Sequence, residues 1–164
     1  MIRPLSPDEA DTIWHIINEA AQAYKGVIPP DCWHEPYMSR EELAREISAG
    51  VIFFGYETAR RVVGVMGRQD LGEVVLIRHA YVLSSHQRQG VGAALLGHLT
   101  KDVAKPLLVG TWRAAWWAVR FYERHGFKLL PEDEKDRLLS TYWSITQRQR
   151  QTSVVLADEK WLKP

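Results

Sequence analysis

Apolar residues along this chain follow two different periods. Between residues 6 and 24, Ile13, Ile16 and Ile17 fall on one face at helical spacing. Shorter apolar runs such as VIFFGYE (residues 51–57) have the length and β-branched or aromatic content of strands. The alternation of the two patterns along the whole sequence predicts a mixed α/β protein.

Capping residues set the start of two predicted helices. Ser6 precedes Glu9 by three residues, and Ser39 precedes Glu42 by the same interval, which is the signature of a capping box. Gly50 then ends the second helix. The patterns together predict helices over residues 6–24, 39–50, 91–101, 114–126 and 131–143, and strands over residues 1–6, 51–57, 60–69, 73–83, 106–112, 127–130 and 152–158.

These elements predict a partly antiparallel sheet of about seven strands within one domain, residues 1–164. The formal net charge is +1, so no bulk electrostatic attraction to nucleic acid or to an acidic membrane is expected. No long apolar run is present and the first residues soon turn polar, so we expect neither a membrane span nor a signal peptide. The single cysteine, Cys32, suits a reducing, cytoplasmic location.

A glycine-rich turn interrupts the middle of the chain in the stretch VLSSHQRQGVGAALLGHL (residues 82–99). It lacks the Gly-Lys-Ser/Thr of a P-loop and the third glycine of a dinucleotide fingerprint. Successive amides at a helix N-terminus can instead bind a diphosphate, while a plain tight turn is the structural alternative. The predicted diphosphate-binding residues are Gln87, Arg88, Gln89, Gly90, Val91, Gly92 and Ala93.

Two spaced motifs resemble those of the GNAT acetyltransferase superfamily. The first is Gln-Arg-Gln-Gly-Val-Gly-Ala at residues 87–93, and the second is AVRFYERHGF at residues 118–127. The resemblance implies a GNAT fold with helices on both sheet faces, a splayed central strand pair and acetyl-CoA as cofactor. It also implies that the strand backbone at Ala80, Tyr81 and Val82 contacts the pantetheine arm. Ala115 departs from the family, which often has Asn there.

The resemblance further suggests which groups carry the chemistry. Tyr122 occupies the position of a tyrosine that points at the cofactor sulfur in many relatives, so it is the candidate acid; packing against the sheet is the alternative. Some relatives carry a glutamate base where this chain has Leu76. His79, whose unperturbed pKa is about 6.5, is the candidate base instead, with a structural histidine or a water relay as alternatives.

The segment between the first two helices borders the acceptor site in relatives. Here it gathers polar residues, and we predict that Asp31, His34, Glu35 and Tyr37 bind the acceptor. A Cys32–His34 nucleophile pair is a weaker alternative to a partly buried structural cysteine. A metal site is weaker too, because no second cysteine or paired-histidine spacing completes a zinc site. We therefore predict no metal.

The sequence thus predicts an acetyl-CoA-dependent N-acetyltransferase that acts by direct attack of a primary amine. The acceptor is a small molecule or a peptide, and the protein a monomer or homodimer. Two alternatives stay open: a non-catalytic acyl-CoA-binding sensor or interaction module, and a protein acetyltransferase acting on N-termini or lysines. The motifs do not identify the acceptor.

Overall fold

The computed structural model describes residues 1–163, and the chain divides into two compact units. The first unit comprises Met1–Ala23, His34–Asp70 and Ile77–Val103. The second comprises Tyr24–Trp33, Leu71–Leu76 and Ala104–Pro164. The organisation as one domain stays a prediction.

The strands form a seven-stranded, mostly antiparallel sheet in the order β1-β2-β3-β4-β5-β7-β6. The predicted fold class, a mixed α/β protein with a sheet of about seven strands, is confirmed. The predicted splay of two central strands stays a prediction. The strands are β1 (Ile2–Pro4), β2 (Ile52–Thr58), β3 (Arg61–Asp70), β4 (Val75–Val82), β5 (Leu107–Trp112), β6 (Lys128–Leu129) and β7 (Ser153–Ala157).

All five predicted helices are present, and two short ones near the C-terminus were not predicted. The helices are α1 (Ala10–Ala20), α2 (Arg40–Ser48), α3 (Val91–Thr100), α4 (Trp116–Arg124), α5 (Glu132–Tyr142), α6 (Gln147–Gln151) and α7 (Glu159–Leu162). Both predicted caps form: the Glu9 carboxylate accepts the Ser6 N–H at 2.9 Å, and the Ser39 hydroxyl accepts the Glu42 N–H at 3.1 Å. Short 3₁₀ turns at Pro7–Glu9 and Ala21–Tyr24 extend α1 at both ends.

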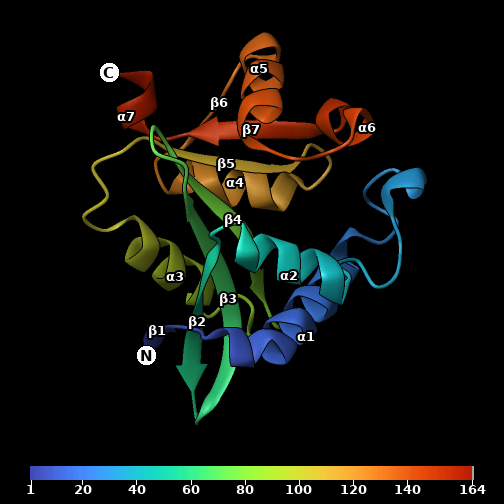
Figure 1. Ribbon diagram of the computed structural model, residues 1–164, viewed down its shortest axis with the longest axis vertical. Helices are drawn as coiled ribbons and strands as arrows, with labels where there is room; N and C mark the ends of the chain where they lie inside the picture. Colours follow the sequence, from blue (N-terminus) through green and yellow to red (C-terminus); the bar gives the residue numbers. More distant parts are fainter. Residues whose placement is uncertain (164) are drawn as a thin grey trace. The chain divides into compact units, whose positions relative to one another are not determined.

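In the first unit, the β2–β3 hairpin carries helices on both faces. Figure 1 shows α1 and α2 on one side of the hairpin and α3 on the other. The hairpin turns through Ala59 and Arg60, whose φ values of 49° and 61° give the left-handed two-residue turn that matches strand twist. The two strands predicted over residues 51–57 and 60–69 thus form a hairpin.

Gly64 lets α3 lie directly on β3. A Cβ at this position would lie 2.7 Å from Cγ1 of Val91, the first residue of α3, and 3.4 Å from Leu95. Both of these side chains are buried. Because any larger residue would push the helix away, Gly64 fixes the place at which α3 begins, immediately after the glycine-rich turn.

The second unit is built on β5, β7 and β6, with α5 on one side of these strands and α4 on the other (Figure 1). Its core cluster contains leucines and valines of the β-strands and of α5, including Leu76, Leu108 and Val155. Trp143 lies over Gly110 of β5, where a Cβ would be 3.2 Å from the indole. This packing explains why glycine interrupts an otherwise bulky strand.

Candidate functional site

The glycine-rich turn ends at an exposed glycine, Gly90, directly before α3. Gly90 is the N-cap residue of α3 and has φ = 80°, a left-handed conformation that glycine adopts without strain. The first intrahelical bond runs from Ala94 N–H to Gly90 C=O at 3.0 Å. The amides of residues 91–93 precede it and have no acceptor within the helix. The sequence therefore produces a set of free helix-start donors at the place predicted for a diphosphate.

The space beside Gly90 is open. No atom lies within 4 Å of the position that a Cβ would occupy there, and Gln87, Arg88 and Gln89 are exposed. A glycine selected only for tight packing would have close neighbours, as Gly64 has. The open space at Gly90 leaves room for a ligand beside the main chain, but Gly72, with φ = 90°, is equally open, so the diphosphate site at this turn stays a prediction.

Two contacts hold the beginning of the turn in place. The Glu19 carboxylate, on α1, accepts the Ser84 N–H at 3.0 Å and also the Ser84 hydroxyl. Ser84 begins the 3₁₀ turn Ser84–His86, and the side chain of Gln87 then donates to Val82 C=O at 3.2 Å. The turn is thus tied to α1 and to the end of β4.

Ala80, Tyr81 and Val82, predicted to contact pantetheine, form the half-buried C-terminal end of β4. His79, just before them, has φ = 55°, which is a costly left-handed conformation for a non-glycine residue inside a strand. Such outliers often occur where a strand must redirect its backbone for function. The left-handed residue of β4, the strand predicted to contact pantetheine, is therefore His79, the predicted base.

His79 lies beside a carboxylate that the sequence analysis did not identify. Its Nε2 is buried and 3.2 Å from Oε1 of Glu46 on α2, although the orientation is not that of a hydrogen bond. Arg78 binds the same carboxylate with both of its terminal nitrogens, at 2.9 and 3.0 Å. Burial by itself would raise the pKa of Glu46, but His79, Arg78 and Arg45 outweigh it and hold the pKa below its usual value.

Leu76, at the position where some relatives carry a glutamate, is fully buried in the core cluster of the second unit. An ionised carboxylate there would lie among leucines and valines and would be strongly disfavoured. The apolar packing around residue 76 therefore disfavours a glutamate at this position.

Tyr122, the predicted acid, lies on α4 in the second unit and is 5% exposed. Its ring contacts Phe121 and Phe127 edge to face, with centroids 5.1 and 5.8 Å away. Burial, and secondarily Tyr24, raises the pKa of the Tyr122 phenol well above its ordinary value. The group is therefore protonated throughout the neutral range, as a proton donor to a thiolate must be.

The family model of the acetyltransferase (GNAT) domain matches residues 14–140, which is more than half of the chain. The chain belongs to the GNAT acetyltransferase family. It is therefore an acyltransferase of the CoA-dependent class, for which acetyl-CoA is the standard donor. The predicted family and the predicted cofactor of that family are confirmed. No curated protein matches the sequence of this GNAT acetyltransferase.

Several solved structures share its fold. The PaiA N-acetyltransferase of Thermoplasma acidophilum, solved with coenzyme A, is 17% identical with a TM-score of 0.68, and the match covers 96% of this chain and 97% of that one. The ribosomal-protein-S18-alanine N-acetyltransferase of Escherichia coli is 20% identical with a TM-score of 0.68, covering 96% and 92%. The N-acetylglutamate synthase of Neisseria gonorrhoeae, solved with coenzyme A and N-acetyl-glutamate, is 21% identical with a TM-score of 0.64, covering 96% and 34%.

The four predicted acceptor residues fall in different units of this GNAT acetyltransferase. Asp31 belongs to the second unit, where Arg148 binds its carboxylate with two hydrogen bonds of 2.8 and 3.2 Å and lowers its pKa. His34, Glu35 and Tyr37 belong to the first unit. In that unit the His34 ring stacks on the Tyr37 ring, with the ring centroids 6.3 Å apart. A cationic acceptor at Asp31 has to compete with Arg148, which the sequence did not reveal.

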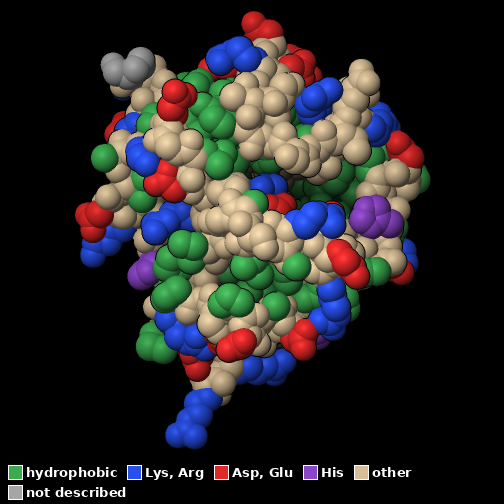
Figure 2. Space-filling view, viewed as in Figure 1, with side chains coloured by type: hydrophobic (Ala, Val, Ile, Leu, Met, Phe, Trp, Pro, Cys, Tyr) green, Lys and Arg blue, Asp and Glu red, His purple; other side chains and the backbone are tan. Residues whose placement is uncertain are grey.

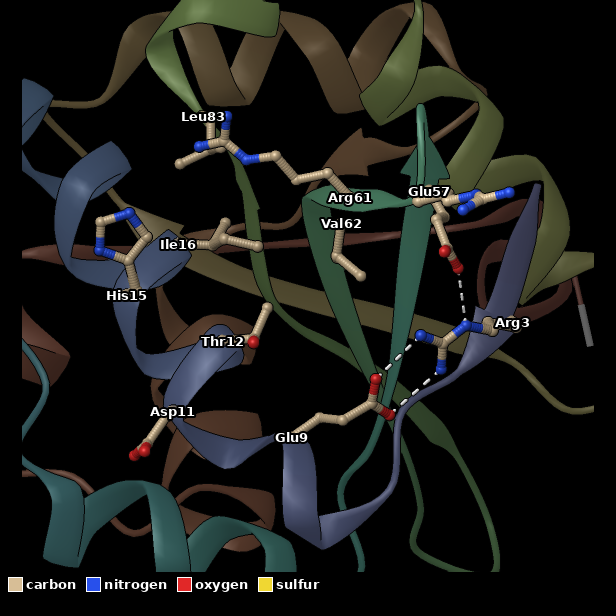
Figure 3. A pocket seen from close by; sticks show the side chains of 11 residues that line it. Arg3, Glu9, Asp11, Thr12, His15, Ile16, Glu57, Arg61, Val62 and Leu83 are labelled. Carbon is tan, nitrogen blue, oxygen red and sulfur yellow. Dashed lines mark hydrogen bonds and ion pairs between the residues drawn. The ribbon is translucent and has the colours of Figure 1, made fainter.

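A cavity of about 460 Å³ opens on the first unit, but no predicted site residue lines it (Figure 3). Arg3 lies between Glu9 and Glu57 and binds both, at 2.8 Å in each case. Its hydrogen bond to Glu9, together with the Ser6 N–H, lowers the pKa of Glu9 to about 2. The charged residues at this side of the cavity thus satisfy one another.

Three further findings concern the surface charges, the helices and the grouping of possible metal ligands. On the face shown in Figure 2, the described basic and acidic side chains are interspersed, without a large patch of one sign. Each helix within residues 1–163 is too short or too polar to cross a bilayer. Within the same residues, no group of three or more His, Cys, Asp or Glu side chains is arranged so that it could hold a metal ion.

Proposed function

We propose that this GNAT acetyltransferase transfers the acetyl group of acetyl-CoA to a primary amine, by direct attack while both substrates are bound. The observation that carries the proposal is the exposed turn at Gly90, whose left-handed backbone leads directly into the first amides of α3 and has open space beside it. The fold is similar to that of an N-acetyltransferase solved with coenzyme A, which supports a coenzyme A site in this chain.

In this proposal the backbone amides of residues 87–93 bind the diphosphate of coenzyme A. The positive end of α3 favours the anion, and the exposed Arg88 adds a charged hydrogen bond. The backbone of residues 80–82 pairs with the pantetheine arm. These contacts fix the cofactor at both ends of its flexible chain.

The transfer requires a neutral amine, a stabilised oxyanion and a protonated leaving group. An alkylammonium with a pKa of about 10.4 is mostly charged at pH 7, so His79 takes a proton from the amine, directly or through water. The amide N–H of Ala80 stabilises the oxyanion. Tyr122 then donates its phenol proton to the thiolate of coenzyme A as the C–S bond breaks.

The acceptor is an amine on a small molecule or a peptide. Proteins of similar fold include one named for a ribosomal-protein alanine and one solved with N-acetyl-glutamate, so the fold serves both classes. Selection in this chain is therefore proposed to come from its own loop residues Asp31, His34, Glu35 and Tyr37.

Titration calorimetry with acetyl-CoA, followed by a thiol-release assay over a panel of amines and peptides, tests the proposal. Binding with release of coenzyme A by small amines is the expected result. Release with peptides alone indicates a protein acetyltransferase, and binding without release by any acceptor indicates a non-catalytic acyl-CoA sensor. Absence of binding at high micromolar acetyl-CoA overturns the assignment of the turn.

A further inference from the structure

The buried side of the His79 ring faces a fixed carboxylate. Its Nε2 lies 3.2 Å from Oε1 of Glu46 and, among the described residues, has no partner in hydrogen-bond geometry. One face of the His79 ring has an apolar neighbour, because the ring stacks on Phe53 with centroids 5.9 Å apart. A small rotation of the ring would align an Nε2–H with the carboxylate.

Glu46 is held too firmly to act as a mobile base. Arg78 donates to both of its oxygens, at 2.9 and 3.0 Å, and Arg78 itself donates to Gln69 at 3.2 Å. Gln69 in turn donates to the C=O of Ala49 at 3.0 Å, immediately after α2. A carboxylate bound bidentately by an arginine stays ionised and is a poor proton acceptor.

We infer that Glu46 is a positioning residue for His79 and completes a Glu46–His79 dyad that serves as the base of the proposed transfer. The carboxylate accepts Nε2–H, which leaves the lone pair of the imidazole on Nδ1. Nδ1 first takes one proton from the acceptor ammonium, which leaves a neutral amine, and Glu46 stabilises the imidazolium until that proton returns to solvent. The neutral amine then attacks; as the C–N bond forms and the C–S bond breaks, the second proton of the nitrogen passes to the freed Nδ1 and on to solvent, and the thiolate takes its proton from Tyr122. This inference rests on the proposed function, and specifically on the role of His79.

The charged groups around Glu46 and His79 decide how a change at Glu46 alters protonation of the imidazole, which can be measured. Glu46 is the carboxylate beside His79, Arg78 of β4 is a neighbouring cation that binds it, and the neutral Gln69 of β3 accepts from Arg78. Arg45 and Glu42 of α2 act at longer range, through Glu46 and Arg78 respectively. Replacing Glu46 by glutamine leaves Arg78 as the nearest charge, which disfavours the imidazolium.

The first test is the midpoint of the His79 imidazole, followed by NMR in wild type and in Glu46→Gln without any substrate. The inference expects the midpoint to fall by about one pH unit or more in the variant. Glu46→Asp, which keeps the charge but withdraws it from Nε2, is expected to give an intermediate midpoint and serves if the glutamine variant does not fold. An unchanged midpoint overturns the inference whether or not the protein proves to be a transferase.

The second test is a double-variant cycle in kcat with Glu46→Gln, His79→Gln and the combination. Glu46→Gln is expected to lower kcat on the order of 10- to 100-fold with little change in KM. In the His79→Gln background it should have no further effect, because its role acts through the imidazole. Additive losses would instead show a merely structural role. Absence of turnover in the wild type would count against the proposed function, while the NMR midpoint would still decide whether the pair exists.

Discussion

The carboxylate of Glu19 accepts a 3.0 Å hydrogen bond from the backbone N–H of Ser84, sixty-five residues further along the chain. This contact joins α1 to the 3₁₀ turn that leads into residues 87–93. A second bond from the Ser84 hydroxyl reaches the same carboxylate. Glu19 therefore orders the start of the proposed diphosphate turn without belonging to it.

Replacing Glu19 by glutamine is expected to weaken coenzyme A binding by about 3- to 10-fold. The amide keeps one acceptor oxygen but loses the charge that strengthens both hydrogen bonds. Titration calorimetry with coenzyme A measures the change, and Glu41→Gln, an exposed carboxylate on α2, is the control. Equal affinities in both variants would show that the contact does not order the turn.

Gly90→Ala separates backbone strain from ligand access. The variant is expected to lose about 1 kcal/mol of stability, because a Cβ is disfavoured at φ = 80°, and to bind coenzyme A at least tenfold more weakly. Gly72→Ala is a matched control: Gly72 has φ = 90°, and no atom lies within 4 Å of its Cβ position either. Denaturant unfolding should show similar losses in both variants, but only Gly90→Ala should affect binding. Parallel losses of affinity would contradict the proposed turn.

Tyr122→Phe is expected to lower kcat by about 100-fold and to leave the affinity for acetyl-CoA unchanged, because only the proton donor is removed. Steady-state kinetics and calorimetry measure the two quantities. Tyr142→Phe is the control, since the Tyr142 hydroxyl donates to Glu73 at 3.1 Å in the same unit and is not placed in the proposed site. Full turnover in Tyr122→Phe would exclude the acid role.

The raised pKa of Tyr122 also predicts the alkaline side of the pH profile. Burial keeps the phenol protonated above its ordinary pKa of 10, so ionisation of Tyr122 should not reduce kcat between pH 8 and pH 10. The same raised pKa lowers the free energy of unfolding at higher pH. Above pH 10 the phenol ionises in the unfolded chain but stays protonated in the folded one, so the protein loses stability as pH rises. A tyrosine-dependent fall in kcat below pH 9 would contradict this assignment.

The Asp31–Arg148 ion pair distinguishes two roles for Asp31. If Asp31 binds a cationic acceptor, Asp31→Asn should raise the acceptor KM several-fold, and Arg148→Gln should lower it by releasing the carboxylate. If the pair only orders the loop that contains Asp31, both variants should change KM in the same direction. Acceptor titrations at saturating acetyl-CoA decide between these outcomes.

The local pattern of the sequence was sufficient for most elements. Capping residues at Ser6 and Ser39 and the apolar periods predicted the longer helices and the strands β2 and β3, because these signals act within a few residues. The short helices α6 and α7 were not predicted, since five and four residues are too few for a period to show. The predicted third long strand began at residue 73, whereas β4 begins at Val75, because Glu73 lies in the turn before it.

The sequence by itself determined the glycine-rich turn and the second motif, and with them the family and its acyl donor. A left-handed residue before a helix depends on the absence of a Cβ, which can be read directly from Gly90. The tertiary structure alone decided which side chains meet. Glu46 reaches His79, and Arg148 reaches Asp31 across 117 residues, through contacts between elements that no local period encodes. Such pairings arise from the packing of whole elements, so the ionic partners of the candidate residues appear only once the chain is folded.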